Sequence, residues 1–324
     1  MDFKKIVIYL LKISAAVAII WYMIHSGRLN VKAIYGAKDH LDLIVLSLLI
    51  MFVAIFVTFY RWKLLLKGQN IMLSNKEIIS LGFIGIFFTS VMPGAVGGDI
   101  IKSVYIAKKV KGRTVSSVLT VLLDRIIGLA ALIMICSVGL LINLKTVLHN
   151  TELTSLGTII FISMLATIIM TFFGLSRRVR SNVFFNKLIN KLPLSGFINK
   201  GYDSFHAYRD NHKYLTYSLL LSFVNHALNI TIFYLIALAL GFDQLGIFAY
   251  FFIVPLGLIT MAIPLTPAGI GVGQAAFLKL FEWAMGIKTT VGADAITVWQ
   301  VLFILVSLVG AIFYVSYKKE ESKD

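Results

Sequence analysis

The chain has 324 residues, of which 59% are hydrophobic and only 14% are charged, and its mean hydropathy is +0.89. This composition indicates a polytopic membrane protein and excludes an ordinary soluble enzyme. The formal net charge is +15, but the basic residues stand at the ends of apolar segments, so they are interpreted as orientation signals and not as a nucleic-acid surface. The single cysteine, Cys136, excludes disulfides within the chain and thiolate metal clusters.

Hydropathy predicts six full membrane spans. The first follows Lys4 and Lys5 and lacks a small-residue cleavage site, so we expect a retained helix and not a cleaved signal peptide. Between the spans lie two further apolar segments that glycine and proline interrupt, at about 79–110 and 247–285. The six spans are predicted at residues 6–24, 43–60, 116–142, 154–175, 215–240 and 293–315.

Each interrupted segment has a glycine-rich break where a membrane helix would otherwise continue. The first break runs from Pro93 to Asp99 and the second from Pro264 to Gln274. Lipid cannot satisfy the backbone groups that a break frees, so breaks occur where protein or a water-filled cavity covers them. Paired breaks in two halves of a chain point to a transporter's binding site, although close helix packing is an alternative reason for small residues. The second break contributes these candidate site residues: Pro267, Gly269, Gly271, Gly273 and Gln274.

The distribution of Lys and Arg predicts the orientation of the chain. The N-terminus, residues 61–78, 99–115 and 176–214, and the C-terminal tail together carry 22 of these residues, whereas the other four connections carry five. We therefore expect the first set, with both chain ends, in the cytoplasm. This assignment is self-consistent only if each broken segment enters and leaves the membrane on the same side, as a re-entrant hairpin. The alternative is an ordinary loop between two short spans.

These expectations describe an all-α polytopic membrane protein with about six full transmembrane helices and two re-entrant, glycine-broken helical hairpins. The order span, span, hairpin, span then occurs twice with opposite orientation, which is an inverted repeat. We expect a single integral membrane domain over residues 1–324, with a first repeat at about 1–145 and a second at about 150–317. A basic cytoplasmic loop is predicted at 176–214.

The first break predicts an anion site. Gly97 and Gly98 free the backbone, and a new helix is expected to start near Gly98 or Asp99. The free N–H groups and the positive dipole end of that helix suit a phosphate. Lys102 lies one turn along and would add a charge to the same anion. In the alternative interpretation, Asp99 caps the helix and Lys102 extends to the lipid headgroups.

Charged residues also occur within or at the ends of predicted spans. Asp124 and Arg125 follow the span start near Ser116, at a depth where an isolated charge costs about 2.5–3.5 kcal/mol on insertion scales. Helix neighbours point about 100° apart, so we expect each to find its partner on another helix or hairpin. They form either a functional site or a polar pair that fixes packing. Arg61 is either a snorkelling anchor or a lipid-phosphate ligand. Asp99 and Asp124 are candidates for coupling or gating.

At these residues the chain resembles the transmembrane domain of lysylphosphatidylglycerol synthases and the flippase-like membrane proteins that share it, over nearly its whole length. The family pattern usually has arginine where Lys102 stands and an acidic residue where Gln274 stands. The full-length synthases carry a soluble aminoacyltransferase domain after the membrane part, and this sequence stops soon after its last predicted span, so aminoacyl transfer is not expected of it. The resemblance rests on Arg61-Trp62 with Leu64-Leu65-Leu66, Pro93 through Asp99 with Lys102, Asp124-Arg125 before Gly128, and Pro267 through Gln274.

The resemblance implies a multi-pass protein of the inner (cytoplasmic) membrane that binds or translocates a phosphate-bearing lipid, either an aminoacylated phospholipid or a polyprenyl-linked species. Lys102, Arg125 and Arg61 would then hold the lipid phosphate, and no cofactor, metal ion or nucleic acid is expected. Two alternatives stay open. One is a phosphatidylglycerol lysyltransferase-type enzyme, and the other is a membrane partner of a separate transferase, which would dock on the loop 176–214.

Overall fold

The computed structural model describes residues 14, 17–92, 97–110, 112–175, 208, 211–263 and 266–321. Within these ranges the chain forms helices and no strands. Five helices include stretches that are long and apolar enough to cross a membrane, and they coincide with five of the predicted spans: α3 (Leu41–Gly68), α6 (Thr114–Ile142), α8 (Thr151–Leu175), α12 (His212–Ala239) and α15 (Val291–Glu321). The expectation of an all-α polytopic membrane protein is confirmed.

The remaining elements are shorter: α2 (Val31–Gly36), η1 (Ala37–His40), α4 (Asn75–Val91), α5 (Gly97–Lys109), α7 (Leu144–Leu148), α13 (Ile247–Ala262), η2 (Pro267–Gly269) and α14 (Val272–Met285). Several predicted features lie wholly or mainly outside the described residues: the first span, Pro93 to Val96 of the first break, Pro264 and Leu265 of the second break, and the loop 176–214 apart from 208 and 211–214. Of the first span, residues 14 and 17–24 are described and helical.

The helix α3 runs further than the sequence predicts. It continues to Gly68 instead of ending at residue 60, because the side chains that follow Tyr60 are mostly buried. Trp62 and Leu65 are both 0% exposed. The extension places Arg61 inside a packed helix and not at a free helix end.

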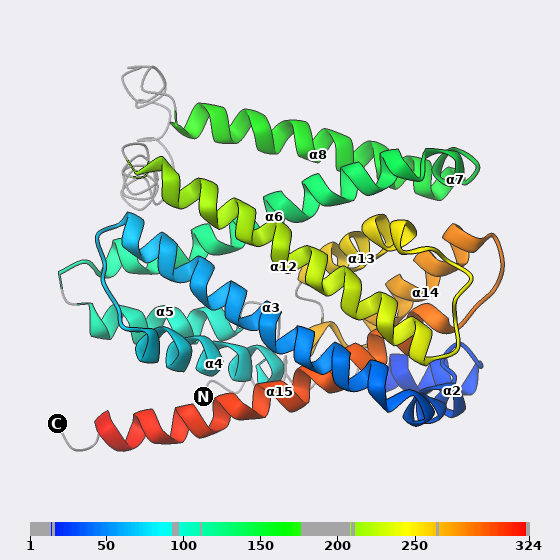
Figure 1. Cartoon of the computed structure of the whole chain (residues 1–324), viewed down its shortest axis with the longest axis horizontal. Coiled ribbons are helices and arrows are strands. Elements are labelled where there is room, and N and C mark those ends of the chain that lie inside the picture. Colours follow the sequence, from blue (N-terminus) through cyan, green and yellow to red (C-terminus); the bar gives the residue numbers. More distant parts are fainter. Residues whose placement is uncertain are drawn as a thin grey trace.

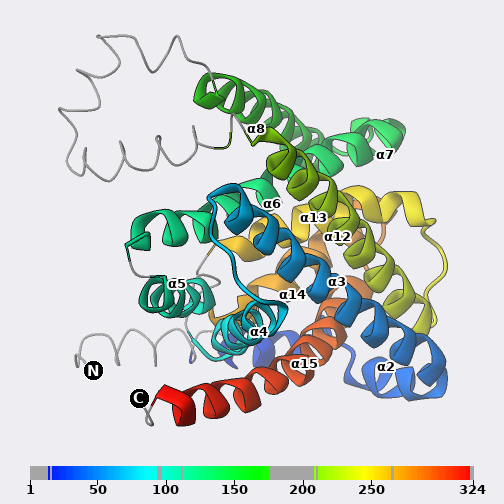
Figure 2. The ribbon, with the colours of Figure 1, turned by 60° about the vertical axis from the view of Figure 1, so that its left-hand side comes forward.

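Two helices of equal length form the centre of the molecule. Both α3 and α12 have 28 residues and pack side by side across the molecule (Figure 1, Figure 2). The pair α4 and α5 lies toward one end of them, and the pair α13 and α14 lies toward the other (Figure 1). The helix α4 packs against α15, whereas α13 packs against α6, and η2 also contacts α4. The two helix breaks are therefore connected through neighbouring elements.

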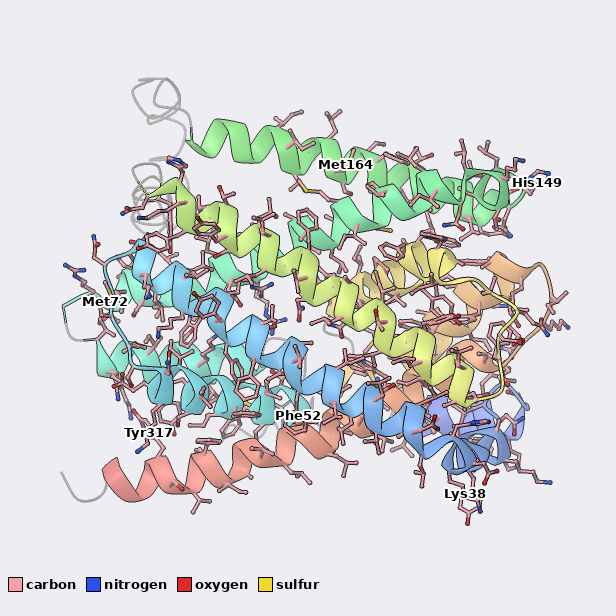
Figure 3. The ribbon with its side chains drawn as sticks, viewed as in Figure 1. Lys38, Phe52, Met72, His149, Met164 and Tyr317 are labelled. Carbon is pink, nitrogen blue, oxygen red and sulfur yellow. The ribbon has the colours of Figure 1, made fainter. Side chains whose placement is uncertain are left out.

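The connections between helices gather at two opposite ends of the molecule. At one end lie the α3–α4 and α5–α6 connections, the start of α12 and the end of α15 (Figure 1). The α6–α8, α12–α13 and α14–α15 connections lie at the other (Figure 1). Figure 3 shows Met72 and Tyr317 at the first end, Lys38 and His149 at the second, and Phe52 and Met164 between them. Among the described connections, those at the first end belong to the group rich in Lys and Arg, and those at the second end belong to the other group.

The outer face of α3 illustrates why this bundle suits lipid. Its exposed side chains are apolar and recur every three or four residues, which is the spacing of one helix face. A soluble monomer rarely exposes a contiguous apolar surface of this kind. The exposed residues of this stripe are Val45, Leu49, Val53 and Phe56.

Both predicted breaks are places where helices end and start again. The helix α4 has 17 residues and α5 has 13, while α13 has 16 and α14 has 14. Each is shorter than the roughly 20 residues that a spanning helix needs. The two members of each pair pack against one another. The first break confirms the expected helix start near Gly98, because α5 begins at Gly97.

Close packing explains one glycine at the first break. A Cβ atom built on Gly98 would lie 2.0 Å from the carbonyl oxygen of Gly85 and 2.1 Å from Oγ1 of Thr89. On Gly97, it would lie 2.5 Å from the Cβ of Met92. The helices α4 and α5 can therefore approach this closely only where side chains are absent.

Candidate functional site

Five ionisable residues from three helices gather beside the first break. Arg61 comes from α3, Asp99 and Lys102 from α5, and Asp124 and Arg125 from α6. Lys102 interacts electrostatically with all four of the others. With three positive and two negative groups, the cluster carries a net charge of +1 when all are ionised. Such a site favours an anion.

Arg61 and Asp124 form a buried, two-pronged ion pair. Each residue is 5% exposed, and the distances are 2.8 Å from Nε to Oδ1 and 3.0 Å from Nη2 to Oδ2. The Nη1 group of Arg61 donates to Oγ of Ser222 on α12 at 2.9 Å. A Cβ atom on Gly128 would lie 3.2 Å from Nη1, so this glycine leaves room for the guanidinium. The arginine therefore ties α3 to α6 and α12, and the snorkelling interpretation does not match its burial.

Asp99 and Arg125 form the second ion pair of the cluster, between α5 and α6. This arrangement confirms that the neighbours Asp124 and Arg125 each have a partner on another helix. The Arg125 side chain is 51% exposed and that of Asp99 is 20% exposed. Arg125 lies about 16 Å along α6 from its start at Thr114. Charged residues at such depth usually face the bundle interior or a water-filled cavity.

Lys102 is buried but forms no ion pair with a carboxylate of the described residues. It is 7% exposed, and its ammonium lies 3.6 Å from the ring centroid of Trp62. Trp62 in turn donates from Nε1 to Oγ1 of Thr120 at 3.1 Å. Within the described part of the chain Lys102 has this cation–π contact but no ion pair. Asp99 and Asp124 act on the Lys102 ammonium electrostatically, but each is in an ion pair with an arginine, so an anionic ligand beside Lys102 would be favourable. The alternative of a lysine extended to the headgroups does not match its burial.

Polar groups of α12 complete the cluster, and some of them were not predicted from the sequence. Ser222 donates to the carbonyl of Ser218 at 2.9 Å while it accepts from Arg61. Nε2 of His226 lies 2.9 Å from the carbonyl oxygen of Gly128 and therefore carries the proton. Its Nδ1 is buried and has no partner among the described residues. Ser222 and Thr120 gave no sequence signal, because serine and threonine in apolar helices commonly bond to the carbonyl of the preceding turn.

The second break is held by amide side chains. Gln274 is 1% exposed; its Oε1 accepts from the backbone N–H of Gly271 at 2.7 Å, and its Nε2 donates to Oε1 of Gln300 at 2.7 Å. Gln300 in turn donates to the carbonyl of Ala268 at 3.2 Å. Backbone groups freed by the break are thus satisfied without any charge. Gly269 and Gly271 have φ values of +70° and +85°, which explains why these two positions are glycine.

The other predicted residues of the second break have local roles. Pro267 is the first residue of η2. A Cβ atom on Gly273 would lie 3.1 Å from Sδ of Met261 and 3.3 Å from Cγ1 of Ile296, so this glycine lies in a close helix contact. Gly273 occupies the same place in α14 as Gly98 in α5.

The two breaks make equivalent contacts with different chemistry. Asp99 and Gln274 occupy the same place in α5 and α14, and each pairs with the residue 26 positions later, Arg125 and Gln300 respectively. The following helical turn repeats this relation. Lys102 covers Trp62 of α3, while the equivalent phenylalanine of α14 stacks on the equivalent phenylalanine of α12. The second contact joins Phe277 and Phe233, with ring centroids 4.8 Å apart and an interplanar angle of 3°.

Comparison with known proteins covers both breaks and the charged cluster. The family model described as "Lysylphosphatidylglycerol synthase TM region" matches residues 9–310. The chain is also similar to the "UPF0104 membrane protein PH1989" of Pyrococcus horikoshii, with 24% identity over 339 residues, which covers 98% of this chain and 98% of that protein. No solved structure gives a significant match. The similarity therefore extends over nearly the whole chain and is not confined to one motif.

Proposed function

The chain belongs to the family of the lysylphosphatidylglycerol synthase TM region, and from this premise we propose that it binds a phosphate-bearing lipid beside the first break and translocates the headgroup across the membrane. The observation that carries the proposal is the cluster of net charge +1. In this cluster Lys102 is buried and has no ion pair among the described residues, and the Arg125 side chain is half exposed. A lipid phosphate supplies the missing negative charge. The acyl chains remain in the bilayer while the headgroup moves.

We propose two different roles for the three cations. Arg125 and Lys102 are the proposed phosphate ligands, since a guanidinium binds phosphate through two hydrogen bonds and an ammonium acts as a point charge. Arg61 is already hydrogen-bonded to Asp124 and Ser222, and its proposed role is to brace the helices α3, α6 and α12 against one another. Asp99, which is partly exposed, is then better placed for coupling than the buried Asp124.

An inverted repeat is the proposed framework of this site. Its support is the exchange of partners between the two halves, in which α4 packs on α15 while α13 packs on α6, with α3 and α12 at the centre. The re-entrant form of the hairpins is supported by the shortness of the four half-helices and by the return of each pair to its own end of the molecule (Figure 1). We propose that the basic end, with both termini, faces the cytoplasm and that the membrane is the inner one.

The test is lipid translocation in proteoliposomes. Fluorescently labelled phosphatidylglycerol is placed in both leaflets, and the fraction reduced by external dithionite reports movement between them. Lys102→Gln and Arg125→Gln should each slow the movement about tenfold or more, because each removes a charged contact to the phosphate. The matched control is Lys279→Gln, which removes a lysine whose side chain is 50% exposed on α14.

Unchanged translocation in both site variants, at wild-type yield and melting temperature, would reject the proposal. A slowdown that Lys279→Gln reproduces would show a general effect of charge. Retention of phosphatidylglycerol on the purified protein, without movement between leaflets, would favour the alternative of a membrane partner for a separate transferase.

A further inference from the structure

We propose that Asp99 is a resident competitor for the lipid phosphate, so that it neutralises Arg125 while the site is empty and the arriving phosphate displaces it. This inference rests on the proposed function and assigns a role within the same site. It makes Asp99 a residue that sets affinity, although it does not itself attract the ligand.

At the second break the same connection is made without charge. Gln274 and Gln300 join α14 to α15 at the places where Asp99 and Arg125 join α5 to α6. Hydrogen-bonding amides are therefore sufficient to hold a half-helix to the next span. The ion pair at the first break needs a reason other than helix attachment.

The two ion pairs of the cluster differ in burial. Arg61 and Asp124 are both 5% exposed, and separating them would leave a buried charge uncompensated. In the other pair, the side chains of Arg125 and Asp99 are 51% and 20% exposed. An ion pair of this openness contributes little to stability and can exchange its partner. Of the two ion pairs, only that of Asp99 and Arg125 is therefore suited to repeated opening.

The net charge that a phosphate would meet in the site depends on Asp99. Because Arg61 and Asp124 neutralise one another, the ligand interacts mainly with Lys102, Arg125 and Asp99. With Asp99 ionised, these three groups sum to +1, and with Asp99 neutral they sum to +2. The carboxylate both repels a phosphate and occupies its strongest donor. Neutralising Asp99 should therefore strengthen the binding of the anion.

The experiment measures the binding of phosphatidylglycerol to purified protein in mild detergent by native mass spectrometry. Asp99→Asn keeps the shape of the side chain and should lower the apparent Kd about three- to fivefold, in line with the modest strength of a partly exposed ion pair. Asp243→Asn, which neutralises an exposed aspartate between α12 and α13, should leave the Kd unchanged. An unchanged or raised Kd in Asp99→Asn would overturn the inference.

A second variant copies the other half of the molecule. Asp99→Gln combined with Arg125→Gln recreates the amide pair of Gln274 and Gln300, and it should keep the wild-type melting temperature while binding at least about tenfold less phosphatidylglycerol. Loss of folding in this variant would show that the ion pair is structural, which also overturns the inference.

Arg125→Gln alone separates this inference from the proposed function. If it leaves phosphatidylglycerol binding unchanged, the proposed function fails with the inference. If it weakens binding while Asp99→Asn does not strengthen it, only the role of Asp99 fails.

Discussion

The two halves of the molecule make the same contacts at their helix breaks, one with charged groups and the other with neutral ones. Beside the first break a lysine covers a tryptophan and an ion pair joins α5 to α6. Beside the second, two phenylalanines stack and a pair of glutamines joins α14 to α15. The neutral half shows that the framework needs only hydrogen bonds and packed rings. The charges of the first half are therefore additions to the framework, and they mark the half in which a ligand is expected.

The largest effect is expected from breaking the buried ion pair. Asp124→Asn leaves the Arg61 charge without its counter-ion and should destabilise the protein by about 3–5 kcal/mol. The equivalent places in the second half hold Ile232 and Trp299. Arg61→Met combined with Asp124→Leu should therefore recover much of the loss. Thermal unfolding in detergent, followed by intrinsic fluorescence, measures both. Equal melting temperatures for Asp124→Asn and wild type would contradict the assignment of a brace.

An intermediate effect is expected at the glycines that pack the half-helices. Gly98→Ala forces a Cβ atom to within 2.0 Å of the Gly85 carbonyl oxygen, so the backbone must move, at a cost of about 1–3 kcal/mol. At Gly273 the nearest atom belongs to the flexible side chain of Met261, 3.1 Å away, and Gly273→Ala should cost less than about 1 kcal/mol. The two melting temperatures test the difference. A larger loss for Gly273→Ala would show that the second break is the tighter of the two.

The smallest effect is expected at the basic end, where Glu77 of α4 pairs with Lys109 of α5 at 2.7 Å. Burial alone would raise the pKa of Glu77, but hydrogen bonds from Lys109 and Ser74 outweigh it and hold the pKa below its ordinary value. A carboxyl group whose pKa is lowered by folding stabilises the folded state at pH values above its ordinary pKa. This contribution is lost as the pH falls through the lowered pKa of the folded state. Both side chains are about one-third exposed, so the contribution is below about 1 kcal/mol.

Glu77→Gln tests this ion pair. The variant should melt slightly below wild type at pH 7, and the difference should shrink as the pH falls through the lowered native pKa of Glu77. The second half has Ala249 and Ala284 at the equivalent places, so no such difference is expected there. A gap between the two melting temperatures that stays constant from pH 7 to pH 3 would mean that the carboxylate is not the source of the effect.

Much of the fold could be predicted because the relevant signals are local. Apolar length identified five spans, and proline with glycine located both places where helices stop. Helix geometry predicted that Asp124 and Arg125 would point to different partners. The identity of those partners could not be predicted, since Arg61 lies 63 positions from Asp124 and no local pattern links them. The extension of α3 past residue 60 was missed because burial against other helices, and not hydropathy, continues it.

The correspondence between the two breaks was only partly visible in the sequence. Gln274 was predicted as a candidate site residue of the second break, whereas Gln300 stands within an apolar span and resembles an isolated polar residue until its contacts are known. The sequence likewise predicted the role of Gly98 only in part. Its predicted part in phosphate binding stays a prediction, while its contact with Gly85 accounts for the absence of a side chain on its own.

The stack of Phe233 on Phe277 has a mechanical consequence. Parallel rings with a 3° interplanar angle hold α12 to α14 without directional bonds, so a small sideways shift changes their energy little. The two-pronged bond between Arg61 and Asp124 permits no such shift between α3 and α6, because both of its hydrogen bonds would lengthen together. The α12–α14 contact is therefore more compliant than the α3–α6 contact, so sliding is expected between α12 and α14 before it occurs between α3 and α6.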